Sequence, residues 1–204
     1  MTLTPSTFLE LRHASTDHAI FVVVPERRFF AIDGRGEPGA ADFRLATTAL
    51  RIVAERLHAR LRREGIPAPS RPGVVECAWW PGEPLAEADV ATAFADRSTW
   101  SWRQLVELPE RATTAMAEAA IDEARSLAGR DVALVRLVSF VEGLSAQLLH
   151  VGGRGDEPES VRRLYAAITG AGLHPAGYLH TILLADPDQV PEGRAREIVR
   201  QPVA

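Results

Sequence analysis

A carboxylate and four indole rings are concentrated in the middle of the chain, where together they could bind an organic cation. All four tryptophans fall between residues 79 and 102, and Glu76 comes shortly before the first two. A carboxylate beside indole rings attracts a cation, and where water is excluded its pKa is raised, which suits a general base. The alternative is that Glu76 only hydrogen-bonds a neighbouring strand or a turn of the other half. The sequence leaves both interpretations open.

Strand alternation divides the tryptophans between two faces. Trp79 and Trp80 are adjacent, so on a strand they point to opposite faces. Trp80 shares a face with Glu76, which predicts that Trp80 lines a pocket and that Trp79 belongs to the core beneath the helices. Trp100 and Trp102 lie two apart and share one face, so either both line a cleft or both belong to the core.

The histidines and hydroxyl groups do not form a recognisable catalytic or metal site. Of the six histidines, His150 and His180 lie on predicted strands. Two histidines without a carboxylate pair do not make a zinc site. Ser145, Gln147 and His150 could be combined as a nucleophile set, but the serine occupies no nucleophile elbow and no orienting aspartate is evident. We therefore expect neither a metal nor another cofactor.

Composition and charge argue against several classes of protein. The chain has 204 residues, of which 46% are hydrophobic, enough for a well-buried core. Its formal net charge of -4 has the wrong sign for wrapping nucleic acid, and the densest basic stretch, 56–63, lies on the outer face of a predicted helix. A single cysteine, Cys77, excludes an internal disulfide, and no stretch resembles a signal peptide or a membrane span. We expect a cytoplasmic protein that binds neither nucleic acid directly nor a membrane.

Hydrophobic patterns predict strands and helices in mixed order. Residues 20–32 are rich in β-branched and aromatic side chains and are interrupted by Pro25, which indicates two short strands around a turn. Apolar residues recur at three- and four-residue spacing over 42–64, which predicts a long helix with one face on a core. The other predicted elements are strands at 74–80, 99–108, 132–140, 146–151 and 178–184, helices at about 111–128 and 158–171, a turn at 186–188, and a final helix or strand toward Pro202.

The order of these elements repeats. A strand, a glycine-rich turn, an amphipathic helix and a strand follow one another over 29–80 and again over 148–184, and the turn 34–38 matches 153–158. Neither glycine stretch is a Walker loop or a complete dinucleotide fingerprint, so both are interpreted as tight turns before helices. Two such units can pack around an approximate twofold axis, with a concave site at their junction.

Several segments in matching order carry a family resemblance over nearly the whole chain: 29–36, 75–80, 100–102, 142–143, 147–152 and 179–187. In these segments the chain resembles GyrI-like small-molecule-binding proteins, the stand-alone relatives of effector-binding domains on some transcription activators. The resemblance implies one α+β domain over 1–204. Its antiparallel sheet would be built from two pseudo-twofold related strand-helix-strand halves, about 20–110 and 111–204, with helices on one face and a ligand cleft at the junction. It also implies binding of amphipathic, often aromatic or cationic, drugs and metabolites, and some relatives hydrolyse cyclopropane-bearing antibiotics.

The last predicted strand departs from the family pattern. The family commonly has His-His-Glu-Ile-Tyr-Leu where this chain has LHTILL at 179–184, so the acidic and phenolic positions are Thr181 and Leu183. These positions share one strand face, where a carboxylate and a phenol could orient water or offset a cation. The resemblance therefore implies a less acidic pocket with weaker water activation. It also makes Glu76 the pseudo-symmetric counterpart of Thr181, facing the same cleft.

These observations favour a protein that sequesters or senses a hydrophobic, aromatic or cationic small molecule in a Trp-lined cleft. The predicted ligand-binding residues, some of which follow only from the resemblance, are Glu76, Trp80, Trp100, Trp102, Leu179, Thr181 and Leu183. Because the chain has no helix-turn-helix pattern, it could act on transcription only through a partner. One alternative is a hydrolase of an electrophilic natural product with Glu76 as general base, although the replacements at 181 and 183 count against it. The other is a structural module whose tryptophans pack a homodimer interface.

Overall fold

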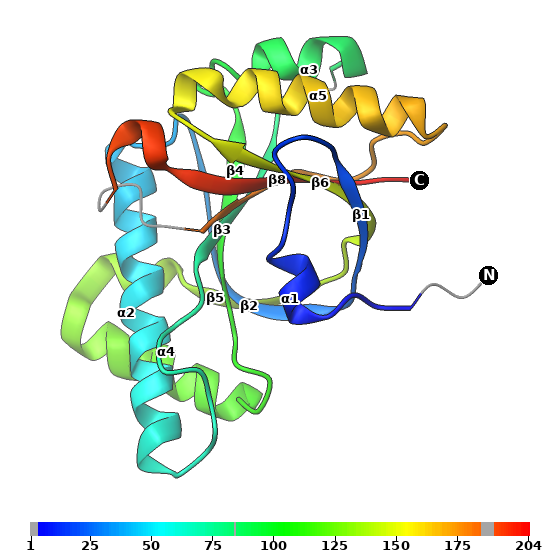
Figure 1. The fold of residues 1–204 in the computed structure, drawn as a ribbon. Helices are drawn as coiled ribbons and strands as arrows, with labels where there is room; N and C mark the ends of the chain where they lie inside the picture. The colour runs from blue at the N-terminus through cyan, green and yellow to red at the C-terminus, as the bar shows by residue number, and fades with distance from the viewer. Residues whose placement is uncertain (1–3, 84, 185–189) are drawn as a thin grey trace.

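One antiparallel sheet forms the framework of the fold (Figure 1). The computed structural model describes residues 4–83, 85–184 and 190–204, and within them eight strands run in the order β1-β6-β8-β7-β3-β4-β2-β5. The strands are β1 (Ile20–Val24), β2 (Arg27–Arg35), β3 (Val75–Trp80), β4 (Ser101–Glu107), β5 (Arg136–Phe140), β6 (Gly143–Val151), β7 (Leu179–Leu183) and β8 (Arg196–Pro202). The predicted α+β fold with an antiparallel sheet is confirmed.

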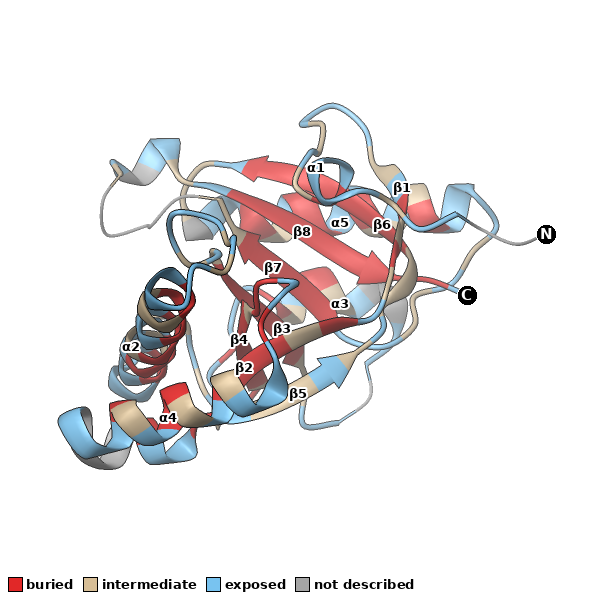
Figure 2. Ribbon diagram, turned by 90° about the horizontal axis from the view of Figure 1, so that it is seen from below, coloured by how far each residue is buried: buried red, intermediate tan, exposed pale blue. Residues whose placement is uncertain are grey.

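Four helices cover one face of the sheet, and the fifth lies on the other. The described α-helices are α1 (Phe8–Leu11), α2 (Ala41–Arg63), α3 (Glu87–Ala93), α4 (Thr114–Ala128) and α5 (Glu157–Gly170), with 3₁₀ turns at Gly129–Leu134, Arg154–Asp156 and Glu192–Arg194. α2 packs on β2, β4 and α4, whereas α5 packs on β6, β8 and α3. Figure 1 shows α1 inside the curve of the sheet, and Figure 2 shows buried residues along the strands and on one side of α2.

The two repeats exchange their first strands. The predicted repeat corresponds to β2–α2–β3 and β6–α5–β7. From the edge to the middle, one half of the sheet reads β5-β2-β4-β3 and the other reads β1-β6-β8-β7, so β3 and β7 meet at the centre. β1 precedes β2 in the chain but pairs with β6, and β5 precedes β6 but pairs with β2. This exchange was not predicted, and the division of the chain near residue 110 stays a prediction.

The long helix α2 follows directly from its apolar stripe. Leu50, Leu57 and Leu61 are completely buried against the sheet and α4. The helix ends because Gly65 takes a φ of +67°, a conformation that favours glycine. The amide of Ile66 then donates to the carbonyl of Leu61 at 2.9 Å, which satisfies an otherwise unpaired helix carbonyl.

Other predicted elements differ from the structure in their bounds. The strand predicted over 132–140 starts only at Arg136, because Gly129–Leu134 forms a 3₁₀ turn. The last segment is the strand β8, one of the two alternatives, and the short helices α1 and α3 were missed. The turn predicted at 186–188 lies outside the described residues. In the part of the chain that is described, no helix combines the length and the apolar character needed to cross a bilayer.

A buried cluster of charged side chains lies on the face of the sheet that the four helices leave uncovered. At its centre, the fully buried carboxylate of Glu76 lies 2.5 Å from the guanidinium of Arg12 and 3.2 Å from that of Arg27. We call the set the Glu76 cluster, and its members are Arg12, Arg27, Glu76, Glu107, Glu142, His180 and Arg200.

The cluster joins strands from both halves of the sheet. Glu142, which lies between β5 and β6, is 2.9 Å from Arg27 on β2 and 3.2 Å from Arg200 on β8. His180 on β7 lies between two carboxylates, with Nδ1 3.1 Å from Glu142 and Nε2 3.3 Å from Glu76. Because a buried charge is stable only when it is paired, these contacts hold the two halves in one register.

The N-terminal segment closes this face. The guanidinium of Arg200 donates to the carbonyl of Leu11 at 2.6 Å, and the amide of Gln147 donates to the carbonyls of Glu10 and His13 at 3.1 and 2.5 Å. Arg12, which follows α1, inserts its side chain into the Glu76 cluster. The helix-free face is therefore filled by the chain itself.

The charges around Glu76 decide its chemistry. Burial alone would raise its pKa, but Arg12, Arg27, His180 and Arg200 together lower the pKa of Glu76 to about 2. The carboxylate is therefore ionised at neutral pH and is a weak base. The raised pKa considered from the sequence is wrong, because the arginines that reach Glu76 are 49 and more residues away along the chain.

Substitution of Gly34 tests the packing between the sheet and the helices. A Cβ on Gly34 would lie 2.2 Å from Cζ2 of Trp102, whose ring is held against Phe43 at 5.2 Å between centroids. We expect Gly34→Ala to lower the free energy of unfolding by about 1–3 kcal/mol in urea titrations, because the buried ring must move. The matched Gly155→Ala, at a glycine of the second repeat with nothing within 4 Å, should behave like wild type. Equal effects of the two substitutions would contradict this account.

Substitution of Glu76 tests the buried cluster. We expect Glu76→Gln to lower the free energy of unfolding by about 3–5 kcal/mol, because Arg12 and Arg27 lose their carboxylate in a buried place. The pKa of Glu76 is about 2 in the fold against an ordinary 4.5, so its contribution is present above pH 4.5 and is lost as the pH falls toward 2. Unfolding titrations at pH 7 and pH 3 measure both effects, with the exposed Glu118→Gln as control. A variant as stable as wild type at pH 7 would show that the cluster is not needed.

Candidate functional site

The pairing of β3 with β7 divides the predicted site residues between two faces. The Cα partner of Thr181 is Cys77, whereas that of Glu76 is Ile182. Thr181 therefore shares a face with Cys77, beneath the helices, and Glu76 points to the opposite side. The prediction that Glu76 and Thr181 face the same cleft is wrong. The assumed correspondence is out of register by an odd number of residues, because only such a shift reverses the face.

The two adjacent tryptophans separate in the same way. Trp79 lies beneath the helices, as predicted, and its indole N–H donates to Oγ1 of Thr181 at 3.1 Å. Trp80 lies on the face of Glu76, half-buried against Tyr178 with the ring centroids 4.7 Å apart. Trp79 therefore lies on the face of Thr181, and Trp80 lies on the opposite face.

Aromatic rings from several elements meet on the helix side of the junction. The ring of Phe43 stacks on Trp79 at 5.6 Å and meets Trp102 edge-on at 5.2 Å, and Phe94 meets Trp79 at 6.3 Å and Trp100 at 5.6 Å. We call these five residues the aromatic box. Trp100 and Trp102 lie together, as alternation predicted, and both are buried in it.

A charged pair is enclosed beside these rings. The guanidinium carbon of Arg97 lies 4.0 Å from the ring centroid of Phe94 and 4.8 Å from that of Trp79. Its Nη2 donates to Oε2 of Glu157 at 2.5 Å, and each side chain of the pair is only 6% exposed. Arg97 precedes β4 and Glu157 begins α5, so the pair joins the two halves on the helix side. The box therefore already holds a cation and its counter-ion.

Both members of this pair were missed in the sequence. Arg97 stands inside the tryptophan-rich stretch 79–102, which was a usable signal. Glu157 belongs to the turn of the second repeat, and only its turn character was considered. The sequence does not indicate that either residue is buried, because their burial follows from the packing of α3 against α5.

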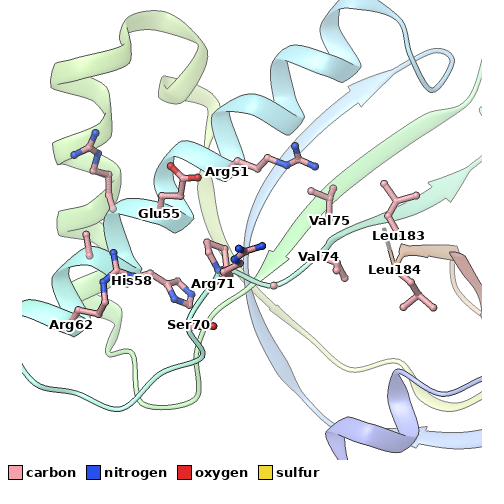
Figure 3. A pocket seen from close by; sticks show the side chains of 14 residues that line it. Arg51, Glu55, His58, Arg62, Ser70, Arg71, Val74, Val75, Leu183 and Leu184 are labelled. Atoms are coloured by element: carbon pink, nitrogen blue, oxygen red, sulfur yellow. The ribbon is translucent and has the colours of Figure 1, made fainter. Parts of the chain in front are cut away.

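Leu179 and Leu183 extend the same strand face from the box to an open groove. Leu179 is buried beside Trp79, its Cα partner on β3. Leu183 is half-buried and lines a groove of about 820 Å³ between α2 and the end of β7. Figure 3 shows its apolar wall, with Val75 and Leu183 facing the side chains that extend from α2.

The border of the groove is mainly basic. Arg51, Arg56, Arg62 and Arg71 line it, against one acidic residue, Glu55. Figure 3 shows Arg51 and Arg71 extending into the space between α2 and β3. The less acidic pocket that the resemblance implied stays a prediction.

The site offers little nucleophilic chemistry. Burial raises the pKa of the Cys77 thiol well above its ordinary value, so the group stays protonated at neutral pH. Ser145, Gln147 and His150 do not converge, since Nδ1 of His150 bonds Ser160 at 2.9 Å and its Nε2 bonds a loop carbonyl. Among the described residues, no group of three or more metal-binding side chains is placed to hold an ion. The arrangement suits binding of an apolar or aromatic molecule.

Comparisons with known proteins identify the fold. No family model and no curated protein matches the chain. Among solved structures it is similar to an uncharacterized conserved protein from Listeria innocua, with a TM-score of 0.82 and 25% identity over 97% of each chain. A hydrolase from Listeria innocua has a TM-score of 0.76 and 24% identity over 96% of each chain. The C-terminal domain of EcmrR has a TM-score of 0.59 and 7% identity, over 92% of this chain and 97% of that one.

These similarities extend over almost the full described chain and agree with the observed sheet and helices. The resemblance found in the sequence is confirmed at the level of structure: the chain has a GyrI-like fold.

Proposed function

We propose that this protein binds a small, largely apolar organic molecule on the helix side of the junction, in the groove at Leu183 and the adjoining aromatic box. The observation that carries the proposal is the groove of about 820 Å³, which ends on the same strand face as Thr181 and Trp79. Ligand sites of this size are usually concave, apolar and supplied with a few polar groups.

The side chains around the site support this function. Leu183, Val74 and Val75 give the groove an apolar wall, and the strand face of Leu183 leads through Thr181 to the ring of Trp79. Polar groups are sparse only beside the rings, where Thr181 and the Arg97–Glu157 pair are the main examples, whereas arginines border the groove. The indole N–H of Trp102 is buried without a hydrogen-bond partner among the described residues, so an acceptor on a ligand or a water could satisfy it.

The resemblance to GyrI-like small-molecule-binding proteins supports the same reading of the site. We propose that the protein sequesters or senses its ligand in the cytoplasm and acts on transcription only through a partner. A homodimer stays a prediction, but the buried tryptophans of the aromatic box are not available to pack it.

Hydrolysis is the second candidate function. Its support is the similarity to two solved structures described as hydrolases from Listeria innocua, each 24% identical to this chain. Glu76 as general base is overturned, because it lies on the opposite face from the groove and its pKa is about 2. Glu157, which lies beside the aromatic box, is already bound to Arg97. These contacts favour binding over turnover.

A neutral polycyclic probe tests binding. We expect N-phenyl-1-naphthylamine to show saturable fluorescence enhancement with the wild-type protein, because its rings leave water for the groove and box. Leu183→Trp should raise the dissociation constant about tenfold by filling the groove, a change of about 1.4 kcal/mol. Leu127→Trp, at an exposed leucine of α4, is the matched control and should leave the constant unchanged. No enhancement, or equal effects of the two substitutions, would contradict the proposed site.

Mass spectrometry tests turnover. We expect a cyclopropane-bearing alkylator incubated with the protein at pH 7 to keep its mass, since Glu157 is bound to Arg97 and the acidic residue that lines the groove, Glu55, is exposed among arginines. A product heavier by one water, formed faster than in buffer and slowed by Leu183→Trp, would establish the hydrolase instead.

A further inference from the structure

Arg97 has the surroundings that proteins provide for a bound cation. Its guanidinium is within 5 Å of two ring centroids, those of Phe94 and Trp79, and its Nη2 is 2.5 Å from the carboxylate of Glu157. Aromatic faces and a carboxylate together attract cations, most strongly where water is excluded. The side chains of Arg97 and Glu157 are each only 6% exposed, so water is largely excluded from the pair.

Arg97 comes from the connection between α3 and β4, and not from the framework of strands and long helices. Arg97 lies between α3 and β4, in a stretch that crosses the helix side of the sheet, whereas Glu157 and Trp79 belong to α5 and β3. Phe94, which also contacts the guanidinium, comes from the same connection at the end of α3. The carboxylate and one ring therefore belong to the framework, and the cation and the other ring belong to the connection.

Charge balance limits what can replace Arg97. The pair contains one positive and one negative group, and Arg97 is the described ion-pair partner of Glu157. Removal of the arginine leaves a carboxylate buried without compensation, which is strongly unfavourable. The vacated position must then be taken by another cation, and a planar cation matches both the carboxylate and the flat rings.

From this geometry we propose that Arg97 is an internal occupant of a binding site for guanidinium- and amidinium-bearing aromatic ligands. Such a ligand replaces the arginine between Glu157 and the ring of Trp79 when the connection before β4 moves aside. This inference rests on the proposed function, since it names the ligand chemistry of the same junction. The arginine lowers the apparent affinity of the wild-type protein, because a ligand binds only the fraction of molecules whose site is vacated.

Chemical rescue tests the proposal. We expect Arg97→Ala to lower the Tm, and methylguanidinium chloride at millimolar concentration to raise the Tm of this variant by about 3 °C with saturation. Wild type should show no saturable rise, and tetramethylammonium chloride at equal concentration should rescue neither protein. Arg162→Ala, which removes an exposed arginine of α5, is the matched control and should not respond. A rise of the same size in the control, or none in Arg97→Ala, would overturn the proposal.

A matched pair of aromatic probes tests the ligand class. We expect calorimetry to show that benzamidine binds Arg97→Ala at least tenfold more tightly than wild type, whereas benzamide, its neutral analogue, gains nothing. If Arg97→Ala does not fold, Arg97→Lys provides a second variant that keeps the charge. The gain in benzamidine affinity over wild type should then be smaller, because the lysine ammonium competes with the ligand. Equal binding of benzamidine to wild type and variant would contradict an internal occupant.

These results separate the two proposals. Saturable binding of N-phenyl-1-naphthylamine at Leu183 without any rescue of Arg97→Ala would leave the binding function standing and remove the internal occupant. Rescue of Arg97→Ala by methylguanidinium without binding of the neutral probe would support the internal occupant and contradict the proposed binding of neutral molecules at the groove.

Discussion

The alternation of side chains along β3 is the constraint on which the rest of the structure depends. Glu76 points to the helix-free side, where arginines and His180 surround it, and Cys77 points to the helix side beside Thr181. A strand cannot turn one side chain without turning all the others. Because a buried carboxylate is stable only among its cations, Glu76 fixes the face on which Trp79 must lie. The position of the aromatic box on the helix side therefore follows from Glu76, which is not one of its residues.

Each face of the sheet is joined across its two halves by buried charges, but the two sets differ in kind. On the helix-free side, several ion pairs interlock and include Arg27 on β2 and Arg200 on β8. On the helix side, among the described residues, Arg97 pairs with Glu157, and the arginine comes from a connection. Loss of one cation from an interlocked network disturbs many partners, whereas a single pair can exchange its cation without disturbing the sheet. The helix side is therefore the side on which exchange with a ligand is structurally tolerable.

The fold was predictable from the sequence to a greater extent than the site. Hydrophobic periodicity located α2 and most strands, and the repeated glycine turn indicated two halves. The exchange of β1 and β5 was not predictable, because no local pattern records which distant strand a segment pairs with. The error at Glu76 has a similar cause: the face was assigned from an assumed match with Thr181, and the true register depends on long-range pairing. Arg97 and Glu157 looked like ordinary charged loop residues because their burial arises only in the folded molecule.

The chemistry available at the junction explains why binding is favoured over catalysis. Thr181 and Leu183 bring no charge, and Cys77 is held as a neutral thiol by burial. The charge of Glu157 is already matched by Arg97, so the carboxylate is not available as a base while that pair is intact. A neutral ligand can occupy the groove and leave the pair in place, whereas a ligand that reaches Glu157 must bring a positive charge of its own. Under the proposed function, the same ion pair keeps water chemistry away from the rings and selects which molecules can lie against them.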